Sequence, residues 1–195
     1  MNGFAKDLKS AIAACVLFAV LLGGAYPAAV WLFGRAVFPE KAAGSLIRSG
    51  GEVVGSSLLA QDFSAGRFFH PRPSAAGQGY DAAHSGGSNL GPLSKGLSDS
   101  VRARVEAYRA ENGLTPETLV PADAVTASAS GLDPHISVEN ARLQAGRVAR
   151  TRGWSVEEVM KKVNAHIEGR TFGFLGQPRI NVLRLNLDLE GKLAP

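Results

Sequence analysis

The stretch from Ser10 to Gly34 contains 25 residues and not one charged side chain, and it constrains the fold more than any other feature. As an α-helix it would be about 37 Å long, which exceeds the roughly 30 Å hydrocarbon core of a bilayer. Tyr26 and Trp31 lie toward its second end, and aromatic side chains favour the membrane interface. The sequence therefore predicts a short leader over residues 1–10, a transmembrane helix over residues 11–34 and an extramembrane domain over residues 35–195.

A cleaved signal peptide is the alternative interpretation of this stretch. The apolar region of a signal peptide is about 7–15 residues long, and no clear small-residue cleavage site ends the longer run found here. An uncleaved single-span anchor is therefore the prediction. Basic residues occur on both sides of the run, so charge alone does not fix its orientation. Cys15, the single cysteine, lies inside the run and cannot form an intramolecular disulfide.

Charge and residue spacing narrow the function classes. The formal net charge of the chain is +4, and its basic residues do not form a stripe, which argues against nucleic acid as a partner. No phosphate-loop motif is present. The four histidines are isolated from one another and lack the spacing of metal ligands, so no metal site is predicted; they are His70, His84, His135 and His166.

Periodicity in the remaining chain predicts both strands and helices. Two strands flank Gly50-Gly51, at Ser45–Arg48 and Glu52–Leu59, and a long structured loop follows over Gln61–Gly96. The segment Val120–Ser128 is predicted as a short strand or an extended turn, and alternation from Leu183 to Leu189 predicts a strand. Helices are predicted at Ser98–Asn112, at Val138–Arg152 with Ser137 as its N-cap, and after a capping box at Ser155 and Glu158. The apolar face of this third helix is predicted to run from Val156 to Ile167 and to end before Gly169. This mixture predicts an α+β domain.

Side chains in these elements have structural and functional interpretations. Four arginines make the second helix basic, and a solvated helix face is the prediction for them; they are Arg142, Arg147, Arg150 and Arg152. The phenylalanines of the long loop are predicted to anchor it to the core, with a contact patch as the alternative; they are Phe63, Phe68 and Phe69.

Two segments could carry chemistry. Ser85–Gly91 is rich in glycine and serine, so its backbone amides could cradle an anion, although the same composition suits a tight turn. Asp133 and His135 lie close together among serines, which suits a hydrolase. The structural alternative is that Asp133-Pro134 turns the chain before the Ser137 helix cap. From the residues alone, the structural interpretation is favoured for both segments.

Four ordered stretches resemble the C subunit of the bacterial high-affinity potassium-transporting P-type ATPase, the Kdp system. The first two are Phe68–Ala75, and Tyr80 with Ser85–Pro92. The third runs from Val120 through Thr126-Ala127-Ser128 to Gly131–Ser137, and the fourth is Phe174–Leu183. The single N-terminal span and the overall length also match, so the resemblance covers essentially the whole chain.

The resemblance implies an accessory subunit of a bacterial inner-membrane complex. Its partners would be a potassium-channel-like A subunit, an ATP-hydrolysing B subunit and a small F subunit. It implies that the chain is not an enzyme on its own, supports assembly, and acts as a catalytic chaperone that raises the ATP affinity of the B subunit. It also implies one membrane helix and an extracytoplasmic α/β domain beside the potassium entrance. ATP association is implied by the resemblance only, and no intrinsic cofactor is expected.

The expected surface facing partners or nucleotide consists of the loops that carry these motifs. Its residues are Phe69, Arg72, Pro73, Ser74, Ser85, Gly86, Gly87, Ser88, Asn89, Leu90, Gly91, Gly131, Leu132, Asp133, Pro134 and His135. Two other classes stay open as alternatives. One is a membrane-tethered extracytoplasmic hydrolase that uses Asp133, His135 and a serine, and the other is a tethered module that binds a small anion.

Overall fold

The computed structural model describes residues 2–192, which fall into two compact units divided between Leu46 and Ile47. The first unit is mainly a continuous helix made of α1 (Asn2–Val20), a π-helical turn (Leu21–Ala25) and α2 (Tyr26–Val37). Over Gly3–Val37 it is long and apolar enough to cross a membrane, and none of these residues is buried. The predicted apolar helix is thus present, while its membrane-spanning boundaries at residues 11 and 34 stay a prediction.

The π-helical turn has a local cause in the sequence. Pro27 has no backbone N–H, so it cannot donate to the carbonyl of Gly23. The preceding N–H, that of Tyr26, donates to Leu21 O across five residues. The helix therefore continues through the Gly23-Gly24 pair without breaking.

A short helical turn, α3 (Pro39–Ala42), leads into the hairpin formed by β1 (Leu46–Ser49) and β2 (Glu52–Ser56). Gly50 and Gly51 both have positive φ angles, 59° and 87°, which favours a tight hairpin turn. The predicted hairpin is confirmed. The segment after it, from Ser57 to Ser94, contains neither helix nor strand, which confirms the predicted long loop.

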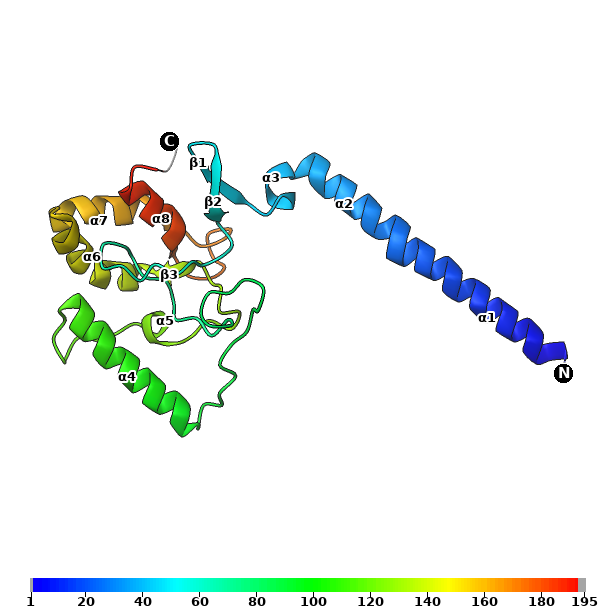
Figure 1. Ribbon diagram of the computed structural model, residues 1–195, viewed down its shortest axis with the longest axis horizontal. Helices are drawn as coiled ribbons and strands as arrows, with labels where there is room; N and C mark the ends of the chain where they lie inside the picture. The colour runs from blue at the N-terminus through cyan, green and yellow to red at the C-terminus, as the bar shows by residue number, and fades with distance from the viewer. Residues whose placement is uncertain (1, 193–195) are drawn as a thin grey trace. The chain divides into compact units, whose positions relative to one another are not determined.

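Three main helices follow, and each begins at a side-chain cap. They are α4 (Lys95–Asn112), α6 (Val138–Arg152) and α7 (Val156–Ala165). Their N-caps are Ser94, Ser137 and Ser155, each of which accepts a hydrogen bond from the backbone N–H three residues later. The capping box of Ser155 and Glu158 is confirmed. Figure 1 shows α6 and α7 grouped with the last helix, and α4 flanking α6.

A small antiparallel sheet completes the domain. Its strands are β3 (His135–Ser137), β4 (Ile167–Glu168) and β5 (Arg179–Asn181), in the order β3-β5-β4. The core lies between this sheet and the helices. Its fully buried side chains include Phe69, Ile136, Val148, Val159, Val163, Ile180 and Leu185. The predicted α+β domain is confirmed.

The C-terminal strand prediction is wrong, because Val182–Leu189 forms the helix α8. Its leucines alternate, but Val182, Leu185 and Leu189 also recur at helical spacing and are buried. Leucine favours helices over strands, and the side chain of Asn181 caps the helix by accepting from Arg184 N–H at 3.1 Å. The apolar residues fit both the two-residue period of a strand and the roughly 3.6-residue period of a helix. The Asn181 cap and the helix propensity of leucine favour the helix.

Other boundaries also differ from the prediction, because β2 ends at Ser56 and not at Leu59, and α4 begins at Lys95 and not at Ser98. The segment Val120–Ser128 contains a helical turn, α5 (Ala122–Val125), in place of the predicted short strand or extended turn. The third main helix ends at Ala165, and Ile167 belongs to β4 instead of the apolar face of the helix. His166 ends the helix because its N–H bonds back to Val163 O and Lys162 O while its backbone leaves the helical region.

Candidate functional site

Three motif-bearing segments that are far apart in the sequence meet in one cluster of loops. Ser74 Oγ donates to Gly131 O at 2.7 Å. Ser85 Oγ and Gly86 N–H both donate to Ser130 O, at 2.9 Å and 3.0 Å. The structure therefore joins residues 72–74, 85–87 and 128–135 in one loop cluster.

Two glycines allow this close approach. Gly131 has a φ of 69°, and a Cβ built on it would lie 2.6 Å from Ala76 N and 2.8 Å from Gly86 O. A Cβ on Gly87 would lie 2.8 Å from Ala129 O. These neighbours are backbone atoms, so a side chain at either glycine would push the segments apart.

Arg72 and Asp133 form the charged pair of the cluster. Arg72 Nη1 lies 3.0 Å from Asp133 Oδ2, while Arg72 Nε is buried and has no hydrogen-bond partner among the described residues. Partial burial alone would raise the pKa of Asp133, but hydrogen bonds from His135 and Arg72 outweigh it and lower the pKa to about 2. Asp133 is therefore a carboxylate at neutral pH, and it holds Arg72 in place.

A hollow of about 560 Å³ lies beside this pair. Four of the predicted site residues line it together with Leu58, Leu59 and the Ser128–Ser130 segment; they are Arg72, Leu132, Asp133 and Pro134. Leu132 and Pro134 are buried, so they support the hollow and expose little surface. The cluster thus brings together a paired charge and apolar walls.

The neighbourhood of His135 does not have the geometry of a serine hydrolase. Its Nδ1 lies 3.6 Å from Asp133 Oδ1 and its Nε2 lies 3.7 Å from Glu168 Oε2. Of the flanking serines, Ser137 Oγ donates to Asp123 Oδ1 at 2.9 Å, and Ser128 Oγ accepts from Asp133 N–H at 3.4 Å. Both imidazole nitrogens therefore face carboxylates, whereas a nucleophilic serine needs one of them as its base.

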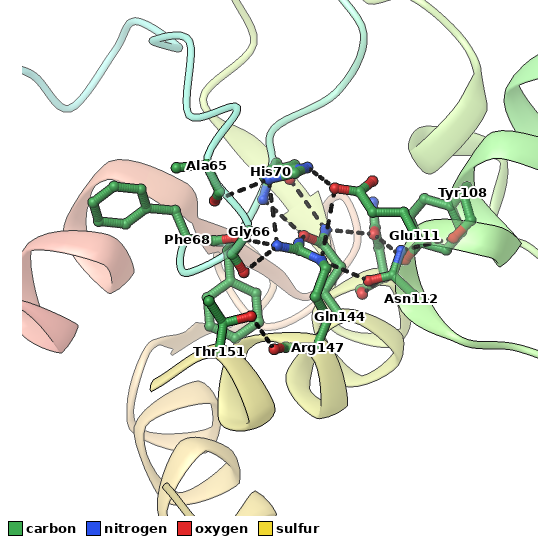
Figure 2. Close-up of polar contacts among 12 residues, drawn as sticks. Ala65, Gly66, Phe68, His70, Tyr108, Glu111, Asn112, Gln144, Arg147 and Thr151 are labelled. Carbon is green, nitrogen blue, oxygen red and sulfur yellow. Dashed lines mark hydrogen bonds and ion pairs between the residues drawn. The ribbon is translucent and has the colours of Figure 1, made fainter. Parts of the chain in front are cut away.

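Arg147 occupies the centre of a buried polar network (Figure 2). Its side chain is 6% exposed, and its Nη1 donates to Gly66 O at 2.6 Å and to Phe68 O at 2.9 Å. Its Nε donates to Asn112 Oδ1 at 3.0 Å. One guanidinium thus fastens the long loop and the end of α4 to α6, so the prediction of a solvated face is wrong for Arg147.

Gln144 and Asn140, one and two turns earlier on α6, extend this network. Gln144 Oε1 accepts from His70 N–H at 2.7 Å, and its Nε2 donates to His70 O at 3.1 Å. Asn140 Oδ1 accepts from Tyr108 Oη at 2.8 Å, and burial together with the nearby charge of Asp123 raises the pKa of Tyr108. The loop backbone belongs to no helix or sheet, so the polar side chains of α6 supply its hydrogen bonds.

Phe69 lies in the core and does not face a partner. Its side chain is fully buried. Asn186 of α8 pairs with its backbone, since Oδ1 accepts from Phe69 N–H and Nδ2 donates to Phe69 O, both at 2.9 Å. The predicted core role of Phe69 is confirmed, and Phe63 packs partly buried against the same core.

A second cavity, of about 300 Å³, lies between the loop, α4 and α6. His70 lines it and joins α4 through a contact of 3.1 Å between its Nδ1 and Glu111 Oε1 (Figure 2). Burial and the charge of Arg147 lower the pKa of His70. Tyr80 lines the same cavity, where burial raises its pKa to about 12, and its Oη donates to Arg72 O at 2.9 Å.

The remaining predicted residues lie outside the hydrogen-bonded part of the loop cluster. Ser88, Asn89, Leu90 and Gly91 are exposed, and Asn89 has a positive φ of 50°. Pro73 is half-buried and lines the smaller cavity. The predicted site thus divides into a bonded part and an exposed part, and its role in binding stays a prediction.

Sequence reasoning missed the polar residues that hold the site in place. These are Asn140, Gln144 and Arg147 on α6 and Asn186 on α8. A signal was available, because Asn140, Gln144 and Arg147 recur at helical spacing next to Ala141, Ala145 and Val148. Polar side chains that flank an apolar stripe in this way are placed to bond the backbone of a neighbouring loop.

Comparison with known proteins identifies the family. A family model described as KdpC, the c chain of K⁺-transporting ATPases, matches residues 8–191. The chain belongs to the KdpC family. The family match covers the apolar helix from residue 8 onward and, in the second unit, the loop cluster and the Arg147 network.

Curated members of the KdpC family support this assignment. A potassium-transporting ATPase KdpC subunit from Myxococcus xanthus is 52% identical over 189 residues, which cover 95% of this chain and 88% of the relative. The KdpC subunit of Mycobacterium tuberculosis strain H37Rv is 50% identical over 185 residues, which cover 95% of this chain and 98% of the relative. A relative from Caulobacter is 50% identical over 188 residues, with coverages of 96% and 94%.

Proposed function

We propose that this chain is the C subunit of a potassium-transporting ATPase complex and is anchored in the bacterial inner membrane by Gly3–Val37. The observation that carries the proposal is the family match over residues 8–191, which includes both the helix and the α+β domain. The helix adds physical support, because large apolar side chains along it are exposed in the isolated chain. A bilayer or neighbouring apolar helices would cover them.

The proposed role is accessory and not catalytic. The motif residues best suited to chemistry are bonded to one another within the loop cluster. Asp133 holds Arg72, and Ser74 and Ser85 donate to backbone carbonyls. These contacts fix the shape of a surface, as an accessory subunit needs, and the hydrolase alternative loses its serine–histidine pair.

The proposed effect on ATP affinity is indirect. We place the α+β domain outside the cytoplasm, across the membrane from the site where the B subunit would hydrolyse ATP. The chain would then raise ATP affinity by binding one conformational state of the complex better than another. The bonding of Ser85–Gly91 supports this, because Gly86 N–H, one of the amides that an anion cradle would use, donates to Ser130 O.

Purification of the tagged full-length chain from its native membranes tests the proposal. A channel-like A subunit, an ATP-hydrolysing B subunit and a small F subunit should be recovered with it, together with potassium-stimulated ATP hydrolysis. A strain that lacks the chain should fail to grow at low potassium and should recover when the chain is supplied. Recovery of the chain alone, or normal growth without it at low potassium, would contradict the proposal.

The exposed part of the predicted site offers a finer test. Asp tolerates the left-handed backbone of Asn89 almost as well as Asn does, so Asn89→Asp should leave the fold intact while adding a negative charge. We expect weaker assembly or a higher KM for ATP in the purified complex. Ser100→Asp is a control that adds the same negative charge on the exposed face of α4. Intact assembly and an unchanged KM in Asn89→Asp would remove this segment from the proposed interface.

A further inference from the structure

The loop between β4 and β5, Gly169–Pro178, carries an exposed apolar tip that the predicted site does not include. Phe172 is 83% exposed, Phe174 is 70% exposed and Leu175 is 48% exposed. We call these three residues the aromatic tip; the loop that carries them is drawn in orange in Figure 1 and lies between α7 and α8 along the chain. Contiguous exposed aromatic residues on a soluble domain mark a binding surface more often than chance placement does.

Hydrogen bonds close the backbone of the tip into a fixed shape. Thr171 and Leu175 exchange two backbone bonds, each of 2.9 Å, and Gly173 N–H donates to Arg170 O at 3.0 Å. At the base of the loop, Arg170 Nη2 donates to Gln177 Oε1 at 3.1 Å and Arg179 pairs with Glu168 at 3.2 Å. The aromatic tip is therefore presented in a defined arrangement on a closed loop.

The backbone at Phe172 carries strain that has no evident role inside the domain. Its φ is 54°, which is unfavourable for a bulky side chain and suits glycine or asparagine. Because the phenylalanine side chain is exposed to water, it adds no burial energy that would offset the cost of this backbone conformation. Strain of this kind concentrates at functional contacts.

The size of the aromatic tip indicates what kind of contact it makes. It exposes on the order of 400 Å² of apolar surface, which is the size of the largest patch on a typical monomer and about half of what one side of a stable interface buries. The tip alone would therefore not hold two freely diffusing proteins together. It suits a chain that a second element already tethers to its partner, because tethering raises the effective concentration of the contact.

We propose that the aromatic tip inserts into an apolar socket on a neighbouring subunit of the ATPase complex, with a carboxylate or carbonyl acceptor opposite Arg170. This inference rests on the proposed function, which supplies the tethering helix and the partner subunits. Phenylalanine, leucine and arginine in a closed loop match the composition of anchors that fill pockets at protein interfaces.

A protein socket explains the aromatic tip better than a lipid surface does. Binding to anionic lipid strengthens with the number of exposed basic residues, and residues 169–178 contain only Arg170. The next basic residue, Arg179, is paired with Glu168. A loop with a fixed shape also loses less conformational entropy when it binds a protein pocket. Binding to a fluid lipid interface does not require a fixed shape.

Phe172→Asn separates binding from folding, because asparagine is comfortable at the backbone conformation of this position. In the full-length chain, co-expressed with the other subunits, we expect about tenfold less chain to remain on the complex after a stringent detergent wash. The thermal midpoint of the chain itself should stay unchanged or rise. Leu119→Asn, at an exposed apolar position outside the tip, is the matched control and should be retained like the unmodified chain.

A photo-crosslinking amino acid in place of Phe174 identifies the occupant in the same complex. We expect a crosslink to another protein subunit. A crosslink to lipid only, or to nothing, would overturn the inference, as would full retention of Phe172→Asn or equal loss of Leu119→Asn. Failure of the proposed function is distinguishable, because the unmodified chain itself would then not be recovered with an ATPase.

Discussion

The two halves of the long loop differ in what happens to their polar groups. In residues 62–76, Gln144, Arg147 and Asn186 bond the backbone of Gly66, Phe68, Phe69 and His70. In residues 85–93, bonds to Ser130 tie down Ser85 and Gly86, and the chain then emerges with Leu90 46% exposed and Leu93 99% exposed. Both halves are rich in small residues, but only the first half also carries phenylalanines that reach the core, at Phe63 and Phe69.

The difference teaches that polar side chains elsewhere in the fold decide which part of a loop is structural. A net hydrogen bond stabilises by about 1 kcal/mol, whereas a buried backbone group left unpaired costs about 1–3 kcal/mol. The first half can therefore be buried only because α6 and α8 supply its partners. Within the part of the chain that the structure describes, the second half lacks that support beyond Gly86 and presents its side chains outward, where an interface can use them.

Removing Arg147 should have the largest effect. Arg147→Ala leaves the carbonyls of Gly66 and Phe68 and the amide oxygen of Asn112 without their donor. We expect the free energy of unfolding to fall by about 3 kcal/mol or more, measured by urea unfolding of the full chain in detergent. Arg142→Ala on the exposed face of the same helix should change it by less than about 0.5 kcal/mol. Equal effects of the two variants would contradict the structural role of Arg147.

Substitution of Gly131, where the two halves of the loop meet, should have the second largest effect on stability. Gly131→Ala combines a positive φ with a Cβ 2.6 Å from Ala76 N, so we expect a loss of about 2–3 kcal/mol in thermal or urea unfolding. Gly153→Ala has a similar φ of 67° but open space around its Cβ, and should cost about 1 kcal/mol. The larger loss of stability in Gly131→Ala than in Gly153→Ala measures how tightly the loops pack together. Equal losses would mean that the loops can separate freely.

The Arg72–Asp133 pair should contribute less, and its contribution should depend on pH. The pKa of Asp133 is lowered to about 2 in the folded chain, so its stabilising effect is fully present above the unfolded pKa of about 4 and is lost as the pH falls through 2. Because a third of the side chain is exposed, we expect Asp133→Asn to cost about 1–2 kcal/mol at pH 7. Urea unfolding at pH 7, 4 and 2 should show that the difference in free energy of unfolding between the unmodified chain and Asp133→Asn shrinks toward zero. A constant difference would contradict the assigned pKa.

The exposed half should give the smallest effect on stability. Leu90→Ser removes a half-exposed apolar side chain and should change the free energy of unfolding by less than about 0.5 kcal/mol. We still expect less of the variant chain to co-purify with the ATPase. A large loss of stability would show that the two halves of the loop do not differ as described.

Local sequence signals predicted much of the fold. The caps at Ser137 and Ser155 and the glycine at position 113 are short-range devices, so α6 has the predicted bounds and α4 ends where expected. The C-terminal helix could not be predicted by alternation, because nearly every residue of Val182–Leu189 is buried and both periods fit. The cap at Asn181 and the helix propensity of leucine resolve that ambiguity in favour of the helix.

The candidate site was predictable only in part. The motif segments were found from their order along the chain, but their contacts through Gly131 and Ser130 depend on distant backbone atoms. The buried position of Arg147 was missed because charge suggested solvent, while its partners are carbonyls of a loop some 80 residues earlier. Long-range hydrogen bonds of this kind leave no signal in local composition.

The location of the α+β domain tests the central claim most directly, because an indirect effect on ATP requires the domain to lie outside the cytoplasm. Cys15 is replaced by alanine and Ser98, exposed on α4, by cysteine. Intact cells are then treated with a thiol reagent that cannot cross the membrane. We predict labelling of Ser98→Cys from outside, at the same level before and after lysis. Labelling that appears only after lysis would place the domain with the nucleotide and contradict the account.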